Sequence, residues 1–242
     1  MTVIVKNRLL NYGDAIIYQD VDWFKFSIDS VLLANFVTIR LRDKKIIDLC
    51  SGNAPIPMLL SFKTKSKIYG IELQKEVYDL GVRSIIENKM DSQIDFINGN
   101  IKDVGNLFCS DSFDVVVCNP PYFRVNKNSY LTENKIKRVA RHEVEVNLSD
   151  IFSSAKYLLK TGGIFAMVHR PERFVEIIYG MREVGIEPKR VQFVYPKDGC
   201  ECNMLLIEGI KNGSVGLKIL PPLVLHSIDG TYRDEIRKYF EL

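Results

Sequence analysis

An asparagine, two prolines and two aromatic residues follow one another from Asn119, directly after the β-branched run of residues 114–118. The run predicts a strand buried on both faces, and the prolines end it because proline lacks an N–H and fixes φ. The Asn119 side-chain oxygen and the Pro120 carbonyl oxygen could accept both hydrogen bonds of an exocyclic amine, while Tyr122 or Phe123 covers its flat face. The stretch therefore predicts a clamp for a planar amine. The alternative interpretation is an ordinary turn that ends a strand.

A second group of residues precedes this clamp and has the layout of a nucleotide-binding unit. Residues 46–49 predict a short buried strand, which a loop of small residues from Cys50 to Pro57 joins to a helix. Residues 67–71 predict the next strand, which ends in Glu72, 20 residues after Gly52. At this spacing a carboxylate meets the ribose hydroxyls of an adenosine cofactor. Alternatively, Glu72 is a solvent-exposed residue at the start of the next helix and binds no ligand.

Strands and helices alternate along the rest of the chain and should bring these two groups together. Further strands are expected at 94–97, 164–169, 191–195 and 204–207, and a turn at Gly162 and Gly163 should precede the second of them. The last two strands suit an antiparallel closing hairpin. This alternation predicts a doubly wound α/β sheet, in which ligands bind at the carboxyl ends of the strands. We expect one domain over residues 1–242, with residues 1–37 forming a hairpin and helix that extend over the cofactor pocket. Ser27 or Asp29 should cap this helix.

A basic run lies immediately downstream of the clamp and is interleaved with Tyr130 and His142. Next to the clamp, such a run would grip phosphates as in proteins that bind single-stranded nucleic acid, whereas a solvated loop is the alternative. The cations of this run are Arg124, Lys127, Lys135, Lys137, Arg138 and Arg141.

The composition is that of a protein with one large core. The chain has 242 residues, of which 46% are hydrophobic and 26% charged, with a net charge of +3. It contains no apolar run near the roughly 20 residues needed to cross a bilayer, and no signal peptide pattern, so we expect a cytoplasmic protein that does not bind membranes. The five cysteines lack zinc-site spacing and are expected to be reduced thiols, with no metal bound.

The Asn-Pro-Pro-Tyr stretch resembles the motif of S-adenosylmethionine-dependent amino-methyltransferases. From Phe26 to the Pro221-Pro222 tail, the chain resembles bacterial enzymes that methylate N6 of adenine 37 in a valine tRNA. This resemblance implies a Rossmann-like, seven-stranded methyltransferase sheet, S-adenosylmethionine as the cofactor and tRNA as the partner. We expect the protein to act as a monomer.

The resemblance also assigns roles to individual residues, although the loop after the first strand departs from the family pattern. That pattern is Asp-x-Gly-x-Gly-x-Gly, of which this chain keeps Asp48 and Gly52, with Cys50 and Ala54 in place of two glycines. Both replacements are small, so we expect the loop to keep its shape. The expected cofactor-binding residues are Phe26, Asp29, Asp48, Cys50, Gly52, Glu72, Asn100 and Asn119. Asn119, Pro120 and Tyr122 are expected to be catalytic, and Phe123, Arg124, Lys135, Lys137, Arg138 and Arg141 to bind substrate.

Other functions share this motif. Enzymes that methylate a glutamine amide in release factors usually carry a further N-terminal helical domain, and DNA adenine enzymes generally add a recognition domain. A guanine N2-methyltransferase acting on rRNA would use the same clamp. A catalytically idle RNA-binding module is a different class of function, which the altered glycine loop favours.

Overall fold

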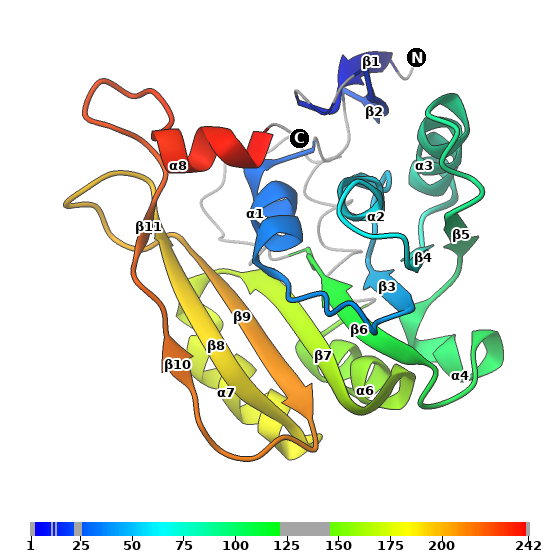
Figure 1. Ribbon diagram of the computed structural model, residues 1–242. Helices are drawn as coiled ribbons and strands as arrows, with labels where there is room; N and C mark the ends of the chain where they lie inside the picture. The colour runs from blue at the N-terminus through cyan, green and yellow to red at the C-terminus, as the bar shows by residue number, and fades with distance from the viewer. Residues whose placement is uncertain (1–2, 11, 13, 22–25, 122–145, 241–242) are drawn as a thin grey trace, which may run out of the picture.

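A mixed β-sheet forms the centre of the molecule (Figure 1). The computed structural model describes residues 3–10, 12, 14–21, 26–121 and 146–240. Across the described part of the sheet, seven strands follow the order β8-β9-β7-β6-β3-β4-β5. Their bounds are β3 (Lys45–Leu49), β4 (Lys67–Glu72), β5 (Ile94–Asn98), β6 (Phe113–Cys118), β7 (Leu159–His169), β8 (Ile186–Tyr195) and β9 (Met204–Lys211).

The direction of the strands confirms the predicted doubly wound sheet with a closing hairpin. The neighbouring pairs β3–β4, β4–β5, β3–β6 and β6–β7 are parallel, whereas β9 is antiparallel to both β7 and β8. The β6 strand pairs with β3 in the register that places Cys118 beside Leu49. Since the strands are parallel, the loop after β3 and the residues after β6 begin at the same edge of the sheet.

The sequence prediction was wrong at one point of this sheet. Gly162 and Gly163 do not form a turn before a strand, because β7 begins at Leu159 and includes them. The register between β6 and β7 shifts between Phe113 and Val115, as at a β-bulge, and Gly162 has a φ of 76°. The glycine pair therefore accommodates an irregularity inside a longer strand.

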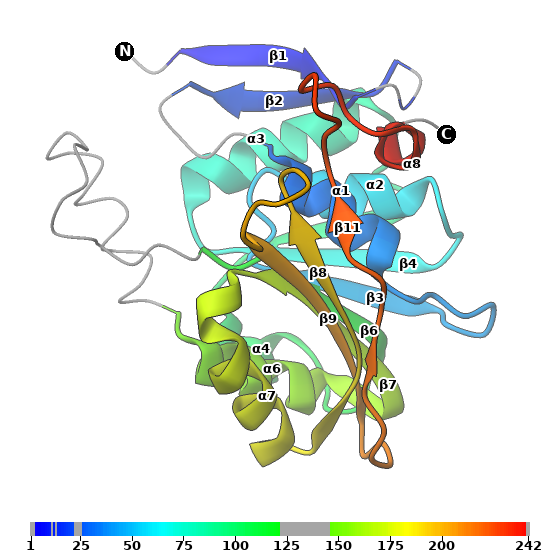
Figure 2. The ribbon, with the colours of Figure 1, turned by 90° about the vertical axis from the view of Figure 1, so that its left-hand side faces the viewer.

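Helices cover both faces of the sheet (Figures 1 and 2). One face carries α1 (Ile28–Phe36), α2 (Pro55–Ser61) and α3 (Lys75–Glu87), and the other carries α4 (Val104–Leu107), α6 (Leu148–Leu158) and α7 (Phe174–Glu183). Two separate apolar clusters fill the spaces between the sheet and these layers. Strands of the central part, such as β3 and β6, are buried on both faces, which explains their continuous apolar sequence.

The N-terminal hairpin packs along α3. Its strands β1 (Ile4–Arg8) and β2 (Ile16–Asp20) form a separate antiparallel sheet. The Tyr18 N–H donates to Ser84 Oγ at 2.9 Å, and the Arg83 guanidinium carbon lies 3.9 Å from the centroid of the Tyr18 ring. Asn88 binds both main-chain groups of Ile16. These contacts fix the hairpin on the outer side of the layer formed by α1 to α3 (Figure 2).

The C-terminal segment adds two short strands to the seven-stranded sheet. Both β10 (Lys218–Ile219) and β11 (Leu223–Val224) pair in parallel with β8. A short helix, α8 (Asp234–Arg237), follows, and the Tyr12 hydroxyl donates to the main-chain oxygen of Tyr239. Short 3-10 helices η1 (Ile101–Asp103), η2 (Pro171–Arg173) and η3 (Lys238–Phe240) complete the described elements.

Candidate active site

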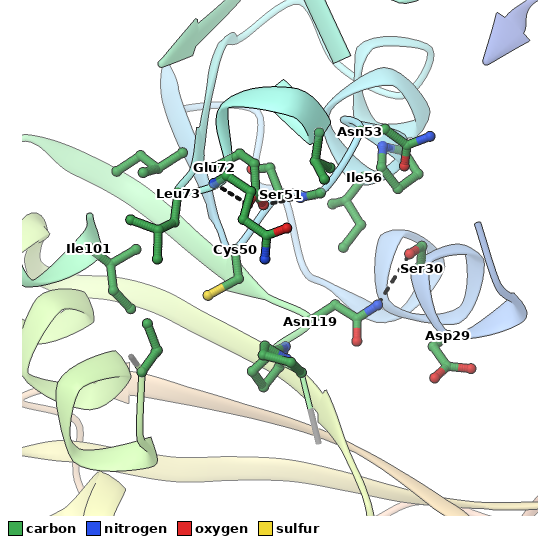
Figure 3. Close-up of a pocket in the computed structure, with 18 of the residues that line it drawn as sticks. Asp29, Ser30, Cys50, Ser51, Asn53, Ile56, Glu72, Leu73, Ile101 and Asn119 are labelled. Carbon is green, nitrogen blue, oxygen red and sulfur yellow. Dashed lines mark hydrogen bonds between the residues drawn. The ribbon is translucent and has the colours of Figure 1, made fainter. Parts of the chain in front are cut away.

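A cavity of about 340 Å³ opens at the carboxyl ends of β3, β4 and β6. This size is within the range of small-molecule sites. Figure 3 shows the side chains that surround it, which come from the loop after β3, the end of β4, the start of α1 and the residues after β6. The predicted site residues that line the cavity are Phe26, Asp29, Cys50, Gly52, Glu72, Asn119 and Pro120.

Three residues of the loop after β3 have a backbone conformation that favours glycine, although two of them carry side chains. Cys50, Gly52 and Ala54 have φ values of 59°, 57° and 70°, all in the left-handed region. A residue with a Cβ pays roughly 1–2 kcal/mol for this conformation. Among the described residues, no atom beyond the chain neighbours lies within 4 Å of the point where a Cβ would stand at Gly52. Gly52 lines the cavity, and the space beside it is open.

Glu72 connects this loop with the end of β4. Its Oε2 accepts the Gly52 N–H and its Oε1 accepts the Gln74 N–H, both at 2.8 Å. The residue is only 7% exposed, and this burial raises the pKa of Glu72 to about 7. A carboxylate offers about four acceptor positions. The Leu73 N–H is a further backbone donor to this carboxylate, and the three backbone bonds together leave about one acceptor position for a hydroxyl donor.

An apolar wall stands beside Glu72. Ile71, Leu73, Val77 and Ile101 line the cavity and offer a surface for a flat ring. Asn100, which the family resemblance assigns to the adenine amine, does not line the cavity. Its Oδ1 accepts the Lys102 N–H at 3.0 Å and caps η1. The role of Asn100 in cofactor binding stays a prediction.

Asn119 lies directly after β6, on the opposite side of the cavity from Leu73 (Figure 3). Its Nδ2 donates to Ser30 Oγ at 3.2 Å. Pro120 and Pro121 also line the cavity, as does Asp29, which stands on the first turn of α1 next to Ser30 in the chain. The end of β6 and the start of α1 thus form one wall.

The capping prediction for α1 was wrong for Ser27. This residue occupies the N-cap position with an extended backbone, but its side chain makes no capping hydrogen bond. Both Ser27 and Asp29 instead line the cavity. The polar start of α1 is therefore part of the wall around the site.

Asp48 lies in β3 and does not line the cavity. Its side chain is completely buried, neither carboxyl oxygen has a hydrogen-bond partner among the described residues, and burial raises the pKa of Asp48 well above its ordinary value. The Ser51 hydroxyl donates to the main-chain oxygen of Asp48 instead. A direct contact between Asp48 and a cofactor stays a prediction.

Several residues of the site have no signal in the sequence. Ser30, Asn53, Val146 and Arg170 line the cavity, but none belongs to a recognisable spacing. Asn53 Nδ2 donates to the Tyr18 main-chain oxygen at 2.7 Å, and Arg170 Nη1 donates to the Asn203 main-chain oxygen at 2.8 Å. These are contacts between distant segments, which the sequence alone does not show.

His169, which precedes Arg170, is buried and accepts the Arg170 N–H on Nδ1 at 2.8 Å. Burial lowers the pKa of His169 to about 4, so the ring is neutral near pH 7.

The remaining predicted residues lie outside the described part of the chain. They are Tyr122, Phe123, Arg124, Lys135, Lys137, Arg138 and Arg141. Over the ranges that the structure describes, no three His, Cys, Asp or Glu side chains converge as a metal site would require. In the same ranges no helix combines the length and apolar character needed to cross a membrane.

The fold is that of S-adenosylmethionine-dependent methyltransferases. It is similar to the crystal structure of a predicted O-methyltransferase from Agrobacterium tumefaciens, with a TM-score of 0.70, 19% identity, and coverage of 88% of this chain and 95% of the other. It also resembles geranyl diphosphate C-methyltransferase from Streptomyces coelicolor, whose structure holds S-adenosyl-L-homocysteine, with a TM-score of 0.57, 14% identity, and coverage of 76% and 77%.

The sequence places the chain within this class. Residues 29–194, which are more than half of the chain, match the Eco57I restriction-modification methylase family. The protein therefore belongs to the Eco57I restriction-modification methylase family.

Two curated relatives match most of the chain at low sequence identity. The chain is 21% identical to the tRNA1(Val) (adenine(37)-N6)-methyltransferase of Cytophaga hutchinsonii, over 80% of each protein. It is 24% identical to the enzyme of the same name from Parabacteroides distasonis, over 84% of this chain and 83% of that one.

Proposed function

We propose that the protein uses S-adenosylmethionine to methylate an exocyclic amine, and that this amine is N6 of adenine 37 in a valine tRNA. One observation carries the proposal: Glu72 and Asn119 line the same cavity, so a carboxylate suited to ribose and an amide suited to an amine belong to one site. The family assignment to methylases and the curated relatives support it independently.

The residues around the cavity fit the cofactor. The buried Glu72 carboxylate would accept a ribose hydroxyl, and the apolar wall of Leu73, Val77 and Ile101 would hold the adenine ring. The open space beside Gly52 would admit the ligand close to the backbone. When bound, S-adenosylmethionine supplies a methyl group activated by a sulfonium centre.

The substrate side of the site would position the amine. An exocyclic adenine amine is a poor nucleophile because its lone pair is delocalised into the ring. The Asn119 side-chain oxygen and the Pro120 carbonyl oxygen would accept its two N–H groups and direct the lone pair toward the methyl group. Catalysis then depends mainly on geometry and on acceptors that are already in place. Tyr122 and Phe123 remain the predicted stacking surface for the flipped base.

The nature of the substrate follows from the cost of exposing the base. An adenine in a loop is already partly unstacked, so flipping it costs less than flipping one from a duplex. The anticodon loop meets this condition, and the relatives carry the name of an enzyme that acts at adenine 37. The basic run from Arg124 to Arg141 would hold the phosphates of the loop.

A second candidate is adenine in DNA, because the matching family is described as a restriction-modification methylase. Both substrates present the same amine, so the clamp alone does not distinguish them. Guanine N2 in rRNA, a glutamine amide in a protein and an idle RNA-binding module are the other outcomes that a test must separate.

Methyl transfer to matched substrates tests the proposal. The purified protein is incubated with radiolabelled S-adenosylmethionine and a valine tRNA transcript, the same transcript with guanine at position 37, duplex DNA, rRNA fragments or a glutamine-containing release-factor peptide. We expect label in the first transcript alone, and N6-methyladenosine in its nucleoside digest by mass spectrometry. Label chiefly in DNA, rRNA or peptide would overturn the tRNA assignment. Absence of cofactor binding in calorimetry would favour the idle module.

A further inference from the structure

Ser30 is a cavity residue to which neither the motif nor the proposed chemistry gives a role. It lies in the first turn of α1, is only 3% exposed and lines the cavity. Its Oγ stands 3.2 Å from Nδ2 of Asn119, although the two residues are 89 positions apart in the sequence. This hydrogen bond, drawn in Figure 3, is a direct link between α1 and the residues after β6.

The two ends of the Asn119 amide are nearly the same size but opposite in character. The oxygen accepts hydrogen bonds and the nitrogen donates two. An amine that presents N–H groups would be attracted by the oxygen and opposed by the nitrogen. The amide must therefore be held with its oxygen toward the amine.

The backbone does not set this orientation. Pro120 restricts the φ and ψ angles of Asn119, yet it leaves free the last side-chain torsion, which exchanges the oxygen and the nitrogen. Asn119 Nδ2 donates to Ser30 Oγ, and this bond holds the amide against α1 with its nitrogen on that side in the structure. The oxygen is then at the other end of the amide.

The residues that follow Ser30 in α1 hold its hydroxyl in position. Val31, Leu32 and Leu33, which follow it in α1, are buried in the apolar cluster on that face of the sheet. The helix therefore holds the hydroxyl in place. At 3% exposure, water has little access to replace the hydroxyl if it is removed.

We propose that Ser30 is a positioning residue that holds the Asn119 amide against α1, with the amide oxygen at the other end, and that it acts on turnover through Asn119 alone. This inference rests on the proposed function, because it assumes that Asn119 receives an amine. Ser30 itself touches neither the amine nor the methyl group in this account.

The test is a double-mutant cycle on single-turnover methylation of the valine tRNA transcript. The net value of a neutral hydrogen bond corresponds to about a 3- to 10-fold change in an equilibrium. We therefore expect S30A to lower the single-turnover rate about 3- to 10-fold. The affinity for S-adenosylmethionine in calorimetry and the melting temperature should stay at the wild-type values. In the N119A background, the same S30A change should have no further effect, since no amide remains to be oriented.

Ser61→Ala is the matched control. Ser61 is also a buried helical serine, but it lies in α2, donates to the main-chain oxygen of Met58 and does not line the cavity. We expect the control to leave the rate unchanged. If S30A does not fold, S30C keeps most of the volume with a weaker acceptor and should give the same pattern at about a 2-fold loss.

The outcomes separate this inference from the function on which it rests. A wild-type protein that methylates no amine would overturn the proposed function and this inference with it. An active wild-type protein with an unaffected S30A variant would overturn the role of Ser30 alone. An S30A loss of the same size in the N119A background would also overturn it, because Ser30 would then act independently of the amide.

Discussion

The Glu72 carboxylate accepts the N–H of Gly52 at 2.8 Å and so joins the end of β4 to the loop after β3. The spacing of 20 residues between them predicts that they serve one ligand, and the structure adds a direct bond between them. Glu72 thus has two functions in the proposed site. It holds the loop in place through Gly52, and it offers its remaining acceptor position to the cofactor.

The first prediction concerns the pH dependence of cofactor binding. Burial raises the pKa of Glu72 to about 7, so the free protein carries this group mostly protonated at pH 6 and mostly ionised at pH 8. Ribose hydroxyls donate to the ionised form, and binding should therefore strengthen as the pH rises through 7. We expect about a tenfold gain in affinity for S-adenosylmethionine from pH 6 to pH 8, measured by calorimetry.

Two variants test whether Glu72 causes this dependence. Glu72→Gln should bind more weakly and show no change across the same pH range. Glu76→Gln, which alters an exposed carboxylate in the first turn of α3, should keep the wild-type profile. A pH-independent wild-type affinity would contradict the role of Glu72. The Glu72→Ala change should weaken binding by about 1.5–3 kcal/mol, the usual range for hydrogen bonds to charged groups.

The second prediction concerns Gly52. In the described part of the chain, a methyl group at this position meets no atom within 4 Å beyond its chain neighbours, yet the φ of 57° strains any residue that has a Cβ. We expect Gly52→Ala to lower the free energy of unfolding by about 1 kcal/mol and also to weaken cofactor binding, because the methyl group enters the space beside the loop. Calorimetry with S-adenosylmethionine and thermal unfolding measure the two effects.

Gly162 provides a matched control for this variant. Its φ of 76° imposes the same kind of strain, and a Cβ there also has none of the described atoms within 4 Å beyond its chain neighbours. Gly162 lies in β7, however, and does not line the cavity. Gly162→Ala should therefore lose similar stability and keep its cofactor affinity. Equal affinities in the two variants would show that Gly52 does not border the ligand.

The sequence predicts those residues of the site that stand at the ends of recognisable strands. Asn119 and Glu72 stand at strand ends that the apolar runs identify, and parallel strands bring their ends to one edge. Ser30 and Asn53 could not be found this way, because their partners, Asn119 and Tyr18, belong to separate segments whose packing is a property of the folded chain.

Interactions of the backbone and side chains in the folded protein explain why the structure differs from the sequence predictions at Asn100 and at the two glycines of β7. Asn100 was assigned to the adenine amine by family position, but its oxygen caps η1 two residues further on. Short polar side chains readily bind nearby main-chain groups in this way. The glycines at 162 and 163 favour a turn in the sequence, whereas β7 continues through them and pairs with β6 on either side, at Leu159 and from Ile164 onward.

The third prediction concerns Asn119 itself. Its contact with the amine should strengthen as the amine becomes a nucleophile, so its removal affects the transition state more than the bound cofactor. We expect Asn119→Ala to reduce the rate of methylation by two or more orders of magnitude while cofactor affinity changes little. If affinity and turnover fell together, Asn119 would organise the cavity and would not act on the amine.

The last prediction concerns the basic run after the clamp. If Lys135, Lys137 and Arg138 contact phosphates of the tRNA, each contact releases counterions on binding and adds to the dependence of affinity on salt. Replacing all three with glutamate should weaken tRNA binding and flatten the slope of log affinity against log salt by about 2, measured by fluorescence anisotropy. The control is a triple charge reversal at Lys44, Lys45 and Lys65. These side chains are exposed and lie where β3 and β4 begin, at the edge of the sheet opposite the cavity. This control should keep a slope near the wild-type value, because long-range charge effects are screened within about 10 Å at ordinary salt. Equal slopes for both variants would show that the run after the clamp is a solvated loop that does not contact RNA.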